Sequence, residues 1–60
     1  MKRFAIRTIM SSSYTFFDSV NQAAAICSTP ESFLDACHQL EDLKVQESVT
    51  RGRLYIVRIA

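Results

Sequence analysis

The stretch Ser28-Thr29-Pro30-Glu31 divides the middle of the chain into two predicted helices. Thr29 can cap a helix, and Pro30 suits the first helical turn because its missing N–H needs no partner there. Glu31 meets the positive end of the helix dipole. A helix therefore begins at this stretch. Its apolar stripe, spaced three and four residues apart, consists of Phe33, Ala36, Cys37, Leu40 and Leu43.

Residues 11–27, which precede this stretch, admit two interpretations. The serines at 11–13 offer hydroxyls that accept the free N–H groups of a helix start, and apolar residues follow at helical spacing. The alternative is a strand from Tyr14 to Ser19, whose alternation places Asp18 on the apolar side. We prefer the helix for this reason. Its apolar positions are Phe16, Phe17, Val20, Ala23, Ala24 and Cys27.

Alternation with period two predicts strands at both ends of the chain. Residues 2–10 form a strand with a cationic outer face, and residues 45–50 and 53–59 form a hairpin around Arg51-Gly52. The last strand is apolar on both sides, which is typical of a central strand. The sequence therefore predicts one small α+β domain over residues 1–60, of order β-α-α-β-β. Two helices pack on one face of its three-stranded sheet.

The charges are separated along the chain. Residues 11–43 contain five acidic residues and no Lys or Arg, whereas both ends are basic, and the net charge is only +1. This separation predicts one acidic and one basic region of the surface. The acidic face of the second helix is a candidate docking surface for a partner, although a solvated helix face is the simpler interpretation. Its residues are Glu31, Asp35, His38, Glu41 and Asp42.

The basic strand residues are a second candidate surface. Arginines beside an aromatic ring such as that of Tyr55 are typical of sheets that contact nucleic acid. Seven basic residues against six acidic ones weaken this interpretation. Arginine on an exposed strand also guards a sheet against edge-to-edge pairing. The candidate nucleic-acid contacts are Arg3, Arg7, Arg53 and Arg58.

The residue types that carry catalysis are sparse and poorly placed. His38 has acidic neighbours within one helical turn, which favour its charged form, but nothing in the sequence buries it. Cys27 and Cys37 lie on the apolar stripes, and we interpret them as reduced, buried thiols. A disulfide across the two helices is the alternative, and a zinc site lacks two further ligands. We therefore expect no enzymatic activity, no cofactor and no metal.

Composition also bears on location. Few cysteines favour a reduced, cytoplasmic setting. The longest apolar run, residues 23–27, is far shorter than the roughly 20 residues that span a bilayer, so we expect no membrane association. Arg7 interrupts a signal-peptide core, whereas residues 1–17 have the composition of a mitochondrial presequence, which is the alternative.

The last strand predicts self-association. Tyr55, Val57 and Ile59 point away from the side that the helices cover. Exposed apolar patches beyond a few hundred Å² are uncommon on soluble monomers, and a domain of this size gains stability by pairing. We therefore expect a homodimer whose function is non-enzymatic. The leading hypothesis is an accessory factor, an inhibitor or regulator that docks on a partner protein, and the alternative is a nucleic-acid-binding protein.

Overall fold

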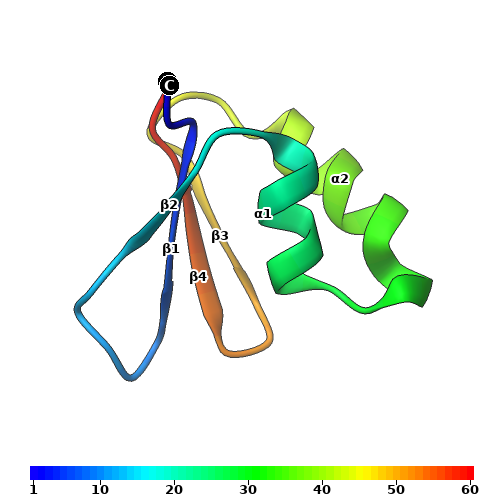
Figure 1. The fold of residues 1–60 in the computed structure, drawn as a ribbon, viewed down its shortest axis with the longest axis horizontal. Coiled ribbons are helices and arrows are strands. Elements are labelled where there is room, and N and C mark those ends of the chain that lie inside the picture. Colours follow the sequence, from blue (N-terminus) through cyan, green and yellow to red (C-terminus); the bar gives the residue numbers. More distant parts are fainter.

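The computed structural model describes all residues from 1 to 60, and it is an α+β fold with two helices and a four-stranded antiparallel sheet. The strand order is β2-β1-β4-β3, so the first and last strands of the chain lie side by side in the centre. Both helices lie on the same side of the sheet (Figure 1). The elements are β1 (Phe4–Thr8), β2 (Thr15–Phe17), α1 (Val20–Cys27), the 3-10 helix η1 (Pro30–Ser32), α2 (Phe33–Asp42), β3 (Ser48–Arg51) and β4 (Leu54–Arg58).

The preferred helix over residues 11–27 is wrong in its first half, and the predicted sheet therefore lacked one strand. Thr15–Phe17 is strand β2, which pairs with β1 so that Phe16 lies opposite Ala5. The objection to a strand here was that Asp18 would join the apolar side. Asp18 lies beyond the last strand residue, however, and its carboxylate pairs with Lys2 Nζ at 3.4 Å. The pairing with β1 therefore decides the conformation of this segment.

Helix α1 begins at Ser19, whose side chain accepts a hydrogen bond from the Gln22 N–H at 3.2 Å. The Gln22 side chain reaches back and accepts the Asp18 N–H at 3.2 Å. These two bonds form a variant of the capping box, in which the side chains of both residues satisfy free N–H groups at the helix start. The Ser-x-x-Gln spacing is a sequence signal for this boundary, and it was missed in favour of the serines at 11–13.

The predicted start of the second helix is confirmed. Thr29 is the cap, and Pro30 begins the turn η1 that leads into α2. The capping contact differs from the expected one, because the Thr29 N–H donates to Ser32 Oγ at 3.0 Å. The two hydroxyls of these residues lie 3.1 Å apart. The cap is therefore shared between two side chains.

The C-terminal hairpin is also confirmed. β3 and β4 pair in antiparallel register from Ser48↔Val57 to Arg51↔Leu54. Gly52 has φ +60°, in the left-handed region where a residue without a Cβ is favoured, and it allows the tight turn. β4 lies between β1 and β3, as its two apolar sides indicated.

The core lies between the helices and the sheet. Phe4, Leu40 and Ile56 are the largest fully buried side chains. The helices contribute mostly small residues, which let the backbones approach closely. The full cluster comprises Phe4, Ile6, Ala23, Ala24, Ala36, Cys37, Leu40 and Ile56. None of the helices has the length and apolar character needed to cross a membrane.

Candidate binding surface on the open face of the sheet

The side of the sheet opposite the helices is uncovered, and we call it the open face. Residues directly opposite one another in neighbouring strands share a face, so the register gives its members. Tyr14 joins them by its contact with Arg7, and Arg3 and Ile59 follow by alternation just outside their strands. The open face consists of Arg3, Ala5, Arg7, Tyr14, Phe16, Ser48, Thr50, Tyr55, Val57 and Ile59.

Arg7 occupies the middle of an aromatic cluster on this face. Its guanidinium carbon lies 4.8 Å from the ring centroid of Tyr55 and 5.7 Å from that of Tyr14. Its Nε donates to the Tyr14 hydroxyl at 3.3 Å. Its Nη1 donates to the carbonyls of Thr8 and Ser11 at 3.2 and 3.1 Å. Arg7 is therefore held in one orientation, and Nη2 remains without an acceptor from the chain.

Several aromatic and aliphatic residues of the open face are substantially exposed. Tyr14 is 40% exposed, Phe16 49% and Ile59 39%. Val57 and Tyr55 are half-buried on the same face. Tyr and Arg are the residue types that most often carry binding energy in protein interfaces, because they combine apolar area with directed polar groups. The open face therefore has the composition of an interface centre.

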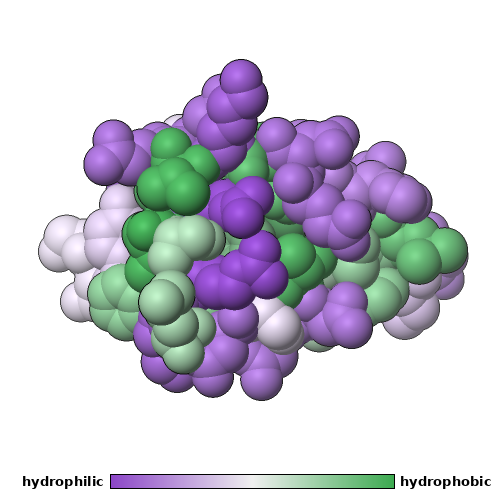
Figure 2. All heavy atoms as spheres, turned by 90° about the horizontal axis from the view of Figure 1, so that it is seen from above, coloured by the Kyte–Doolittle hydropathy of each residue, from purple (hydrophilic) through white to green (hydrophobic).

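The predicted separation of charge follows the layers of the fold. Residues 19–43, which form the helix layer, contain four acidic residues and no Lys or Arg. The remaining residues contain all seven basic residues and two acidic ones. Figure 2, seen from the end at which both termini lie, shows strongly hydrophilic side chains next to hydrophobic ones on the sheet half. The sheet layer is therefore cationic and partly apolar.

The four arginines predicted to contact nucleic acid do not share one surface. Arg3 and Arg7 belong to the open face, and Arg53 lies exposed in the β3–β4 turn. Arg58 points to the helix side of the sheet, where its Nη1 donates to the Leu43 carbonyl at 2.6 Å. Its Nε donates to the Ala60 carbonyl at 3.2 Å. The Arg58 side chain thus links the C-terminal residue to the end of α2 rather than facing outward.

Arg51 joins the sheet to both helices. Its Nε donates to the Cys27 carbonyl at 3.3 Å, at the end of α1. Its Nη1 donates to Gln39 and lies 3.4 Å from the Asp35 carboxylate, both on α2. The Arg51 side chain is only 16% exposed. Sequence reasoning did not single out this residue as a link between layers.

The residues predicted for the acidic docking surface lie together on η1 and α2. All of them are exposed, and Asp35 is the one that pairs with a basic residue of the sheet. They are on the opposite side of the molecule from the open face, because α2 packs on the covered side of the sheet (Figure 1). The set is Glu31, Asp35, His38, Glu41 and Asp42.

The two cysteines are free thiols in the helix layer. Burial raises the pKa of the Cys27 thiol above its ordinary value, and the nearby Arg51 charge opposes this only in part. Cys37 is buried, and its Sγ donates to Asn21 Oδ1 at 3.8 Å. A thiol held in its protonated form is a poor nucleophile. No group of three or more His, Cys, Asp or Glu side chains is placed to hold a metal ion.

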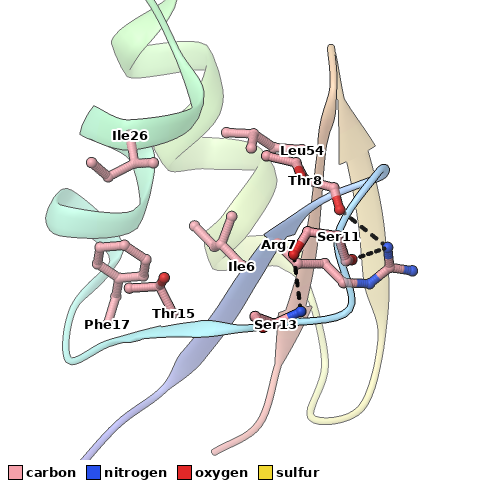
Figure 3. A pocket seen from close by; sticks show the side chains of 9 residues that line it. All are labelled: Ile6, Arg7, Thr8, Ser11, Ser13, Thr15, Phe17, Ile26 and Leu54. Carbon is pink, nitrogen blue, oxygen red and sulfur yellow. Dashed lines mark hydrogen bonds between the residues drawn. The ribbon is translucent and has the colours of Figure 1, made fainter.

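A cavity of about 340 Å³ lies on the helix side, beside the edge strand β2. Thr15 and Phe17 of β2 form one wall, and Ile26 of α1 lies across from them (Figure 3). Ile6 and Leu54 of the central strands line its base. This cavity exists only because residues 15–17 form a strand, so it could not be inferred while they were assigned to a helix.

No protein-family model, no curated protein and no solved structure matches the chain.

Proposed function

We propose that the chain is a non-enzymatic accessory factor, an inhibitor or regulator that docks on a partner protein through the open face. The observation that carries this proposal is the Arg7 cluster. A fixed guanidinium lies between Tyr14 and Tyr55, on a sheet face that no helix covers and that also exposes Phe16. Held side chains lose little conformational freedom on binding, so this arrangement favours docking of a complementary surface.

The charge of the open face supports an acidic partner surface. Its residues include Arg3 and Arg7 and no Asp or Glu. Opposite charge across an interface speeds association and rejects partners of like charge. The acidic face of α2 lies on the other side of the molecule and is the secondary candidate for contact with a basic partner.

Nucleic-acid binding through the open face is the alternative function. Arg3 and Arg7 beside aromatic rings support it. Phosphate binding, however, requires several free cations, because each neutralised phosphate adds to affinity. Only Arg3 and Arg7 of the four candidate arginines belong to this face, because Arg53 lies in the β3–β4 turn and Arg58 is engaged on the covered side. Most residues of the open face are aromatic or aliphatic, and a protein partner would cover this apolar area.

The homodimer stays a prediction, and the charges count against pairing through the centre of the open face. A two-fold axis brings the same residues of both copies together, so the Arg7 cluster of one copy would face that of the other. Tyr55, Val57 and Ile59 are better explained as the apolar part of a surface for an acidic partner.

The cytoplasm remains the proposed location, since the chain carries two free thiols.

The test is affinity capture from the cells that produce the chain, with variants of each face. We expect Val57→Asp, on the open face, to lose the partner that the wild type captures. Leu34→Asp is the matched control, because Leu34 is 70% exposed on α2, and it should retain that partner. Circular dichroism is the check that both variants fold.

Equal capture by Val57→Asp and the wild type would contradict the proposal. Salt-sensitive binding of a single-stranded oligonucleotide, lost in Val57→Asp and Arg7→Ala, would instead favour the alternative function.

A further inference from the structure

The edge strand β2 lacks the polar and charged residues that protect an exposed edge from pairing with another strand. β2 has a strand neighbour on one side only, so the backbone groups on its outer side lack a sheet partner. Its sequence, with Tyr14, is Tyr-Thr-Phe-Phe and contains no Lys, Pro or Gly. The other edge, β3, reads Ser-Val-Thr-Arg and is more polar. Exposed, apolar edges with high β propensity are templates for an added strand.

The cavity lies where the side chains of an added strand would point. Along β2, Thr15 and Phe17 face the cavity, while Phe16 and Tyr14 face the open side. A strand paired with β2 has the same alternation, so every second side chain would project toward the cavity. Its outer wall, Ile26, is 55% exposed although it is apolar. At about 340 Å³ the cavity lies at the small end of ligand sites and suits a large apolar side chain.

The charge around this edge defines the chemistry of the occupant. Residues 1–18 contain Lys2, Arg3 and Arg7 against a single acid, Asp18, which already pairs with Lys2. Arg7 contributes to the cavity wall, whereas its guanidinium points away from Ile26 toward the open face (Figure 3), where Nη2 has no acceptor from the chain. A segment with carboxylates is therefore complementary to the edge.

We propose that the partner contributes an extended, acidic segment that pairs with β2 as a fifth strand and inserts an apolar side chain into the cavity beside Ile26. This inference rests on the proposed function and names the kind of segment that the partner presents. Main-chain hydrogen bonds to β2 would supply affinity, and the cavity and Arg7 would supply specificity.

Other occupants fit this edge less well. A second copy of the chain would present β2 itself, a strand of three residues that leads directly into α1. Because β2 ends at its helix, it cannot continue along the edge as a free extended segment can. A nucleic acid offers neither a strand-pairing backbone nor an aliphatic side chain for the cavity.

The test begins with a displayed library of random nine-residue peptides selected on the intact chain. We expect enriched peptides to alternate apolar residues with others and to carry an excess of Asp and Glu. The best peptide is then synthesised in two N-methylated forms, one methylated at odd and the other at even positions. Only one form should lose affinity, by about tenfold or more, because alternate amides of an added strand face β2.

Ile26→Glu should weaken the peptide by a similar factor, while Leu34→Glu should not. Enrichment of basic peptides, equal binding of both methylated forms, or full binding by Ile26→Glu would each overturn the inference. A dimer in sedimentation whose β2 amides are protected from exchange would also overturn it. If Val57→Asp loses the captured partner while Ile26→Glu retains it, this inference fails and the proposed function stands.

Discussion

The two faces of the sheet are built from the same strands, yet one packs against the helices and the other is uncovered. Ile56 and Val57 are neighbours on β4, but the first is fully buried against the helices and the second lies on the open face. The arginines differ in the same way. Arg51 links the sheet to both helices, whereas Arg7 is fixed among aromatic rings on the uncovered side. The covered face therefore maintains the fold, whereas the open face is the surface proposed for a partner.

The largest expected effect comes from truncating the two neighbours on β4. Ile56→Ala removes fully buried methyl groups and leaves a cavity, which costs about 2–5 kcal/mol. A domain of this size has only about 3–5 kcal/mol of net stability, so this variant should be largely unfolded at 37 °C. Val57→Ala should cost less than half as much. Urea unfolding followed by circular dichroism measures both, and equal losses would contradict the division between the faces.

A smaller effect is expected at the arginines of the β3–β4 hairpin. Arg51→Ala removes donors to the Cys27 carbonyl and to Gln39, and it should lower the free energy of unfolding by about 1–3 kcal/mol. Arg53→Ala, at an exposed turn position, should change it by no more than about 0.5 kcal/mol. Thermal unfolding of the pair tests whether Arg51 joins the layers. If both variants melt together, its hydrogen bonds contribute nothing to stability.

A substitution at Ser19, between β2 and α1, should lower the free energy of unfolding by a smaller amount. Ser19→Ala removes the side-chain cap of α1 and should cost about 1 kcal/mol. Ser12→Ala is the control, because Ser12 is exposed in the β1–β2 loop. Chemical denaturation compares the two variants. A Ser12 effect as large as that of Ser19 would support the helix start at residues 11–13 over the one at Ser19.

The smallest effect concerns the pH dependence that Cys27 contributes. Because its pKa is raised in the folded chain, the unfolded thiol ionises first as the pH increases. The stability linked to this thiol is therefore complete below its ordinary pKa and is lost as the pH rises through the folded value. Wild type should lose more stability than Cys27→Ala between about pH 7 and about pH 10. Parallel curves for the two proteins would show that this thiol is not protected.

Much of the fold follows from local signals. The Thr29-Pro30 boundary, the apolar stripe of α2 and the hairpin around Gly52 were predicted because capping groups, helical spacing and turn chemistry act over a few residues. The segment from Tyr14 to Asp18 was assigned wrongly because its apolar residues fit both periods. Its strand conformation depends on hydrogen bonds to β1. Because β1 lies about ten residues earlier in the chain, the spacing of apolar residues within the segment does not show this pairing.

In the candidate site, too, the features that depend on local sequence were predicted, and those that depend on distant contacts were missed. Tyr55, Val57, Arg3 and Arg7 were recognised from alternation alone, since a strand with two apolar sides must place one of them away from the helices. The hydrogen bond from Arg58 to the Leu43 carbonyl was not recognised, because the sequence does not show that these two groups lie close together. The cavity beside Ile26 was also missed, since it is formed by three strands and a helix.

The sequence by itself determined the residue types, the separation of charge and the start of α2, because these depend on composition and on neighbours within a helical turn or a strand. Only the tertiary structure decided that β2 joins the sheet, that Arg7 lies between two tyrosines, and that Arg51 and Arg58 donate to carbonyls at the ends of the helices. Each of these features requires groups distant in the chain to meet, and strand pairing and packing between layers select the pairs that do.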